Sequence, residues 1–228
     1  MTPEELRKRQ LEQLKEAAKI FLRPMERLPF PVVIEAMTGR AVLPIMNRPE
    51  DGALLKALSA ACIKIVSESK TATIHANRPN DVSTQVEERL DARLNSQNFR
   101  VEKPQAEAGR TPGGYPDRLV WSGKEATYLE VKVSREENID EGSARNFFYQ
   151  PTARPKIRYD ARHLLAGFAI KEVSGKTWVL TRWKIVDLWF LRVKLKPEYN
   201  ADNLEIYREE SILMEGDGQK ILKQKSIS

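Results

Sequence analysis

One stretch, Gly113 to Val133, constrains the fold of this chain more than any other. It reads GGYPDRLVWSGKEATYLEVKV and contains two β-like runs separated by a turn at 122–124. Because side chains alternate along a strand, Glu130 and Lys132 share one face of the second run. A hairpin would bring Asp117, at the start of the first run, towards that pair. The stretch therefore predicts that two carboxylates and an ammonium meet, a suitable cradle for a divalent metal ion and a water molecule beside a phosphate.

Composition narrows the class of protein. The 228 residues are 41% hydrophobic and 31% charged, which is ordinary for a folded soluble protein that buries a sizeable core. The net charge of +6 favours a polyanionic partner without proving one. The N-terminus is charged and lacks the apolar centre of a secretory signal, and no run approaches the roughly 18 apolar residues of a membrane span. We expect a soluble, intracellular protein with no membrane partner.

The few cysteine and histidine residues do not support a catalytic or metal-binding site. Cys62 is the sole cysteine, which excludes an intrachain disulfide and a cysteine-based zinc site. His75 and His163 are the two histidines and lie far apart in the sequence, so a histidine-dependent site is poorly supported. Cys62 and His163 are both expected to have structural roles, Cys62 by packing on an apolar helix face.

Residues 1–82 are predicted to form an N-terminal helical region. Pro3 to Leu22 has the apolar pattern of an amphipathic helix, and Thr2 with Glu5 fits a capping box. The apolar stripe of this helix is compatible with a dimer interface or an arm that embraces DNA, and equally with packing inside the chain. A second helix is expected from 49 to 66. Asp51 is expected to cap the second helix.

Residues 83–214 are predicted to form the core domain, and 215–228 a flexible tail. A helix at 83–96 and a strand at 98–103 are expected before the hairpin, and another helix at 157–166 is expected after it. Further strands are expected at 167–173, 177–180 and within 183–194. This order predicts an α/β (α+β) fold in which helices flank a central mixed β-sheet.

The hairpin residues also carry a family resemblance. Pro116-Asp117, then twelve intervening residues, then Glu130-Val131-Lys132 resembles the P-D…(D/E)-x-K signature of the PD-(D/E)XK nuclease superfamily. The resemblance in architecture extends over about 83–189 and implies a restriction-endonuclease-like core. The compact chain without a P-loop motor, and the segment RYDARHLLAGFAI, are similar to type II restriction endonucleases in particular. The alternative is a solvent-facing Glu–Lys strand pair with no catalytic role.

The resemblance implies a site and a reaction. Mg²⁺, for which Mn²⁺ is expected to substitute, would be held by Asp117, Glu130 and the backbone carbonyl of Val131. Lys132 would orient the attacking water and offset charge on the scissile phosphate, and its part in proton transfer stays open. The implied reaction is hydrolysis of double-stranded DNA to 5′-phosphate and 3′-hydroxyl ends.

The helix at 83–96 offers an auxiliary metal residue, as such nucleases often require. With 3.6 residues per turn, Glu88 points away from the apolar stripe that Val86 belongs to, whereas Glu87 can skirt that stripe towards the sheet. We therefore expect Glu87 to assist in metal binding. Its alternative is an ordinary flank residue of an amphipathic helix.

A basic segment, 142–162, is predicted to recognise DNA. Its side chains combine phosphate contacts with the donors that read base edges, and a loop arginine before the hairpin adds to them. The predicted DNA contacts are Arg110, Arg145, Asn146, Gln150, Arg154, Lys156 and Arg158. The alternative is a solvated basic face.

Partners and rival functions follow from the resemblance. A homodimer would present one site to each strand of a palindrome. A DNA methyltransferase would be the genetic partner, and the location would be the cytoplasm of a prokaryote. Two rivals stay open: a repair or recombination nuclease of the same fold, such as a junction-resolving enzyme, and a DNA-binding protein that keeps the fold without catalysis.

Overall fold

The computed structural model describes residues 2–106, 114–138, 155–196, 207–209, 211–212, 214–216 and 221–224. The chain divides into two compact units. The larger, Arg27–Val193, is called the core unit here. The smaller, called the terminal unit, combines Met1–Glu26 with Lys194–Ser228.

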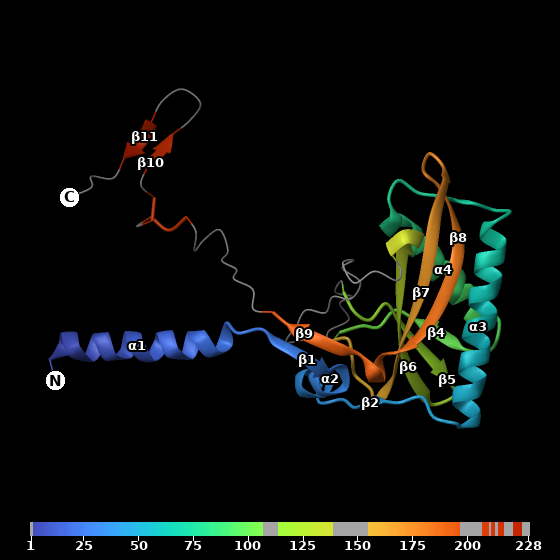
Figure 1. The fold of residues 1–228 in the computed structure, drawn as a ribbon, viewed down its shortest axis with the longest axis horizontal. Helices are drawn as coiled ribbons and strands as arrows, with labels where there is room; N and C mark the ends of the chain where they lie inside the picture. The colour runs from blue at the N-terminus through green and yellow to red at the C-terminus, as the bar shows by residue number, and fades with distance from the viewer. Residues whose placement is uncertain are drawn as a thin grey trace. The chain divides into compact units, whose positions relative to one another are not determined.

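A mixed β-sheet forms the centre of the core unit (Figure 1). Its strands are β2 (Val42–Leu43), β3 (Ile74–His75), β4 (Arg100–Glu102), β5 (Arg118–Ser122), β6 (Glu125–Arg135), β7 (Ala161–Ser174) and β8 (Thr177–Asp187). The order is β3-β8-β7-β6-β5-β4, with β2 beside β7. β7 runs parallel to β6 and β2, and the other neighbours are antiparallel. This mixed sheet with flanking helices confirms the predicted fold class.

Two helices, α3 (Pro49–Ser69) and α4 (Pro79–Asn95), cover one face of the sheet, α3 against β8 and α4 against β6. The apolar stripe predicted for α4, Val86, Leu90 and Leu94, is fully buried, because residues four apart share one side of a helix. Val82, which precedes the predicted helix, lies inside α4 and is buried with them. Cys62 lies in the same core with no exposed surface, and burial raises the pKa of its thiol to about 12. Its expected packing role is confirmed.

The other face carries a second apolar cluster with the short helix α2 (Phe30–Thr38). Phe30 and Ile34 pack there with Tyr128 of β6. His163 of β7 lies against the same rings, 5.0 Å from Tyr128 between ring centroids. Burial lowers the pKa of His163 to about 3, so the imidazole is neutral and structural, as predicted.

The helix predicted at 157–166 is wrong. Strand β7 begins at Ala161 and runs to Ser174 between β6 and β8. Such a central strand is covered on both faces and reads as a continuous apolar run, which periodicity cannot separate from a buried helix. The strand predicted at 177–180 is longer than expected, since β8 continues to Asp187 before the 3-10 helix η3 (Leu188–Phe190).

Asp51 does not cap α3, which corrects a second prediction. Pro49 occupies the first turn, so the cap position falls on Arg48 and Asp51 lies inside the helix. The Asp51 carboxylate is fully buried, accepts a hydrogen bond from the Met46 amide at 3.0 Å, and pairs with Arg48 and Arg162. Asp51 thus lies in the first turn of α3, and its carboxylate binds two guanidinium groups and the Met46 amide instead of capping the helix.

The terminal unit contains α1 (Pro3–Phe21) and a hairpin of β10 (Met214–Gly216) and β11 (Ile221–Gln224). The predicted helix and the Thr2–Glu5 capping box are confirmed, and α1 buries none of its residues. β1 (Met25–Pro29) and β9 (Arg192–Leu195) form a separate two-stranded sheet. Within the described residues, no helix has the length and apolar character that crossing a membrane requires.

Candidate active site

The predicted hairpin is formed by β5 and β6. Their antiparallel register begins at Ser122↔Glu125 and ends at Arg118↔Leu129. Gly123 opens the two-residue loop with φ of 60°, a conformation that glycine adopts without steric cost. Since β5 begins at Arg118, Asp117 lies one residue before the strand and outside the ladder.

The hairpin brings Asp117, Glu130 and Lys132 together. Glu130 and Lys132 share the strand face of Tyr128, and the Lys132 Nζ lies 2.7 Å from the Glu130 Oε1. The Glu130 side chain is only 4% exposed, whereas the Lys132 side chain is 35% exposed and reaches solvent. Burial, and then the negative charge of Asp117, raise the pKa of Glu130 to about 7. A buried carboxylate beside a second carboxylate is therefore poised to bind either a proton or a cation.

The backbone of Val131 faces the same spot. Its N–H donates to the Asp117 Oδ2 at 2.8 Å. In a strand the N–H and C=O of one residue point towards the same neighbouring strand. The Val131 carbonyl therefore also points to the part of the β6 edge that β5, which begins at Arg118 opposite Leu129, does not cover.

The donor set fits a hard divalent cation. The Glu130 Oε2 is buried and has no hydrogen-bond partner, and a buried oxygen of this kind can be satisfied by a cation, a proton or a water molecule. In the described part of the chain, no group of three or more His, Cys, Asp or Glu side chains could hold a metal ion. Two carboxylates and one carbonyl leave the remaining positions to water and phosphate, as Mg²⁺ prefers.

Glu87 comes near the site but is already engaged. Its Oε2 lies 3.1 Å from the Arg118 Nη1, and its Oε1 accepts from the Ser83 hydroxyl at 3.3 Å. Burial, and then the charge of Asp117, raise the pKa of Glu87. Glu88 is exposed, so the geometric choice between the two glutamates agrees with the structure. A role of Glu87 in metal binding stays a prediction.

Sequence reasoning missed Arg118, which lies under the site. Its guanidinium is 4% exposed, and its Nε donates to both oxygens of Asp91 at 2.7 and 2.8 Å. Its Nη1 also donates to the Asp117 carbonyl at 3.0 Å. A signal was present: Glu87 and Asp91 are four residues apart on a helix, hence on one side, and Arg118 alternates with Asp117 on its strand.

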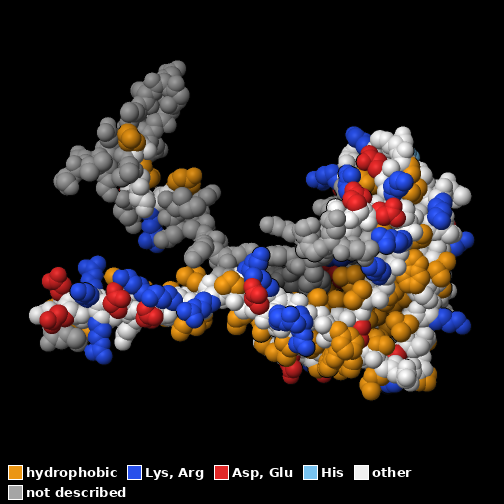
Figure 2. All heavy atoms as spheres, in the orientation of Figure 1, with side chains coloured by type: hydrophobic (Ala, Val, Ile, Leu, Met, Phe, Trp, Pro, Cys, Tyr) orange, Lys and Arg blue, Asp and Glu red, His pale blue; other side chains and the backbone are white. Residues whose placement is uncertain are grey.

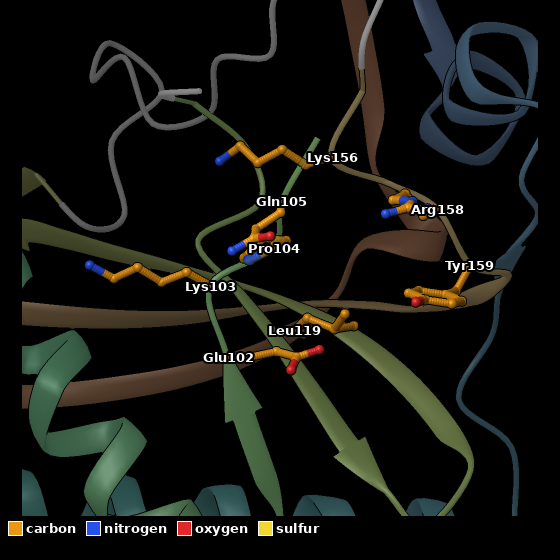
Figure 3. Close-up of a pocket in the computed structure, with 8 residues that line it drawn as sticks. All are labelled: Glu102, Lys103, Pro104, Gln105, Leu119, Lys156, Arg158 and Tyr159. Carbon is orange, nitrogen blue, oxygen red and sulfur yellow. The ribbon is translucent and has the colours of Figure 1, made fainter. Parts of the chain in front are cut away.

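The predicted DNA contacts fall mostly outside the described residues: Arg110, Arg145, Asn146, Gln150 and Arg154. Arg158 is exposed at a hollow of about 370 Å³ (Figure 3). Lys156 also borders the hollow but is only 8% exposed. The remaining lining residues are Glu102, Lys103, Pro104, Gln105, Leu119 and Tyr159.

Comparison with known proteins agrees with this geometry. The model of the type II restriction enzyme MjaV family matches residues 24–210, which include the hairpin and the whole central sheet. The type II restriction enzyme MjaV of Methanocaldococcus jannaschii is 30% identical over 223 residues, covering 90% of this chain and 96% of that protein. A match over most of the core unit, together with a relative of nearly the same length, shows that the chain belongs to the MjaV family of type II restriction enzymes.

Proposed function

We propose that Asp117, Glu130 and Lys132 are the active centre of a Mg²⁺-dependent, sequence-specific DNA endonuclease. Membership of the family makes the chain a site-specific deoxyribonuclease that acts on double-stranded DNA. The observation that supports this location for the chemistry is the buried Glu130 carboxylate, whose Oε2 lacks a partner beside Asp117 and Lys132. The products we propose are 5′-phosphate and 3′-hydroxyl ends.

Each residue of the proposed active centre has a separate role. Asp117, Glu130 and the Val131 carbonyl are the ligands that would hold Mg²⁺, which when bound supplies charge neutralisation at the phosphate and acidifies water. The Lys132 ammonium lies at the solvent-facing side of the carboxylate pair, within 2.7 Å of Glu130. There it orients the attacking water and offsets the negative charge that grows on the phosphate.

We also propose that the active form is a homodimer, because two strands must be cut and a two-fold axis matches a palindromic site. The exposed apolar side chains of α1 support this proposal, notably Leu14 at 67% and Phe21 at 80% exposure. A cognate DNA methyltransferase would protect the host sequence. DNA methylated by that enzyme would then resist cleavage.

Substitution of the three residues tests the site. Asp117→Asn, Glu130→Gln and Lys132→Met are each expected to lower plasmid cleavage at least about 100-fold, as removal of an electrostatic stabiliser does. Glu137→Gln and Lys171→Met remove exposed charges elsewhere and serve as matched controls. Wild-type rates in the three site variants would place the chemistry elsewhere.

The digestion products test the rest of the proposal. Discrete fragments with Mg²⁺ and none with a chelator are expected, and DNA ligase should rejoin them without prior phosphorylation. Structure-dependent cutting of branched DNA would instead identify a junction-resolving nuclease. Binding of DNA with no cleavage under any divalent ion would identify a protein that keeps the fold without the reaction.

A further inference from the structure

Lys156 has a position unlike that of the exposed cations expected to contact DNA. It lies in the segment 155–160 that leads into β7, and 8% of its surface is exposed. Its Nζ donates to the carbonyl of Gly114 and, at 2.9 Å, to the carbonyl of Pro116. These two carbonyls stand on either side of Tyr115, immediately before Asp117. The Lys156 ammonium thus binds the loop that immediately precedes Asp117, one of the carboxylates of the candidate site.

The segment that carries Lys156 is itself anchored to β6. The Tyr128 hydroxyl accepts hydrogen bonds from the amides of Arg158 at 2.7 Å and Tyr159 at 3.3 Å. The same hydroxyl donates to the Lys156 carbonyl at 3.5 Å. Tyr128 is fully buried and precedes Glu130 by two residues on the same strand face. One end of the connection is therefore fixed to the strand of Glu130.

These contacts form one continuous path from Glu130 to Asp117. It leads from Tyr128 through the Lys156 backbone, along the Lys156 side chain, to the carbonyls around Tyr115. The path matters because the ladder between β5 and β6 ends at Arg118↔Leu129 and leaves Asp117 outside it. Three further contacts hold the same loop: Arg118 donates to the Asp117 carbonyl, the Val131 amide donates to the Asp117 carboxylate, and the Tyr115 hydroxyl bonds the His163 ring.

The charges around Lys156 agree with this position. Burial lowers the pKa of its ammonium, while the negative charges of Asp117, Glu130 and Glu87 act in the opposite direction. A buried ammonium is costly unless it is hydrogen-bonded and near opposite charge, and Lys156 has both. In the same segment Arg158 is exposed at the hollow of Figure 3 and offers a contrasting, solvent-facing cation.

We propose that Lys156 is a positioning residue for DNA cleavage, which holds Asp117 opposite Glu130 through the Gly114 and Pro116 carbonyls. This inference deepens the proposed function and rests on it for the cleavage readout. It also gives Lys156 a role different from the DNA contact that its basic segment suggests. A displacement of about 1 Å in a reacting group can lower a rate about 100-fold, so a clamp distant from the phosphate can still control cleavage.

Amide hydrogen exchange tests the clamp without DNA, metal or activity. The Val131 amide donates to Asp117, so its exchange rate reports whether that carboxylate stays in place. In Lys156→Met we expect Val131 to exchange at least tenfold faster, with Ala166 and Phe168 of β7 unchanged as internal controls. Lys156→Arg, which retains donors for the two carbonyls, should restore slow exchange. Unchanged Val131 exchange in Lys156→Met would overturn the proposal.

Cleavage and binding assays separate positioning from DNA contact. With enzyme in excess over DNA, Lys156→Met should cleave about 100-fold more slowly than the wild type, and Lys156→Arg should recover at least a tenth of the wild-type rate. The slope of log affinity against log salt, measured without divalent ions, should stay unchanged. A slope smaller by about one, with wild-type cleavage of saturated DNA, would show a phosphate contact and overturn the proposal.

Tyr128→Phe keeps the test decisive if Lys156→Met fails to fold. It removes only the hydroxyl that fixes the segment, so Val131 exchange should again rise and cleavage should fall. If Tyr128→Phe has the wild-type Val131 exchange rate and the wild-type cleavage rate, the proposed path from Glu130 to Asp117 is wrong. If the wild type does not cleave DNA while Val131 still exchanges faster in the variants, the proposed function fails and the clamp stands.

Discussion

Glu130 combines two unfavourable conditions for a carboxylate, burial and a neighbouring Asp117, and both raise its pKa. The folded protein without metal therefore binds a proton at Glu130 up to about pH 7, whereas the unfolded chain releases it near 4.5. Between these values the folded state holds more protons than the unfolded state. The contribution of Glu130 to the free energy of unfolding therefore falls as pH rises through this window.

Glu130→Gln is expected to remove this pH dependence. In a chelator, the variant should gain stability relative to the wild type from pH 4.5 to pH 8, by up to about 3 kcal/mol at about 1.4 kcal/mol per pKa unit. Urea denaturation at several pH values measures the difference. Addition of Mg²⁺ at pH 8 should stabilise the wild type and not the variant.

Glu137→Gln is the matched control, because Glu137 is an exposed glutamate just beyond β6. Its stability should follow the wild type at every pH. Parallel pH curves for the wild type and Glu130→Gln would contradict the assigned cause.

The sequence predicts the residues of the candidate site better than the residues that hold them in position. The proximity of Asp117, Glu130 and Lys132 is predictable from the sequence, because it requires only strand alternation and one hairpin. The structure does bring the three residues together. Their role in cleavage stays a prediction. The sequence predicts Lys156 as a DNA contact and does not indicate its burial, because that burial depends on the Gly114 and Pro116 carbonyls, about forty positions earlier in the sequence.

Between elements, Arg118 joins β5 to α4. Its buried guanidinium meets Asp91 and Glu87, so one cation serves two partly buried carboxylates. Burial is the main reason that the pKa values of Asp91 and Glu87 are raised. Loss of the cation would leave both carboxylates without their partner.

Arg118→Met is expected to lower the free energy of unfolding by about 3 kcal/mol at pH 8, the cost of removing one partner of a buried ion pair. The loss should be smaller at pH 4.5, where the two carboxyl groups can take up protons. Chemical denaturation at both pH values measures this. Arg158→Met, which removes an exposed arginine, should change stability by less than about 0.5 kcal/mol; equal effects of the two variants would contradict the assignment.

The elements themselves were predictable to different degrees. α4 was recognised because it buries only one side, so its apolar residues repeat every fourth position. β7 was mistaken in part for a helix because both of its faces are covered and its apolar run has no alternation. Its identity as a strand depends on pairing with β6 and β8, which local sequence does not contain.

At the scale of the whole molecule, α1 presents apolar side chains that it does not bury. Figure 2 shows acidic and basic side chains along α1, with apolar side chains gathered towards its end. Leu14 and Phe21 are seven residues apart and therefore on one side of the helix. A second copy of the same stripe would cover them.

Leu14→Asp combined with Phe21→Asp is expected to convert a dimer into a monomer, because each buried interface would gain unpaired charges. Sedimentation velocity measures the mass, and supercoiled plasmid should then accumulate nicked circles in place of linear DNA. Arg9→Asp adds an aspartate on another side of α1 and should leave the dimer intact. A wild type that sediments as a monomer would show that α1 does not form a dimer interface.

The unequal lengths of the paired strands also limit which insertions the family can accept. β5 has 5 residues and β6 has 11, so the site exists because β5 begins only opposite Leu129 and leaves the rest of that edge of β6 open. Two residues added between Asp117 and Arg118 could extend β5 in register, and backbone amides would then occupy the edge that Val131 offers. Such a chain would keep its sheet and its three charged residues and lose the opening between them. Variation in length should therefore be tolerated in the turn after Ser122 and excluded just before Arg118.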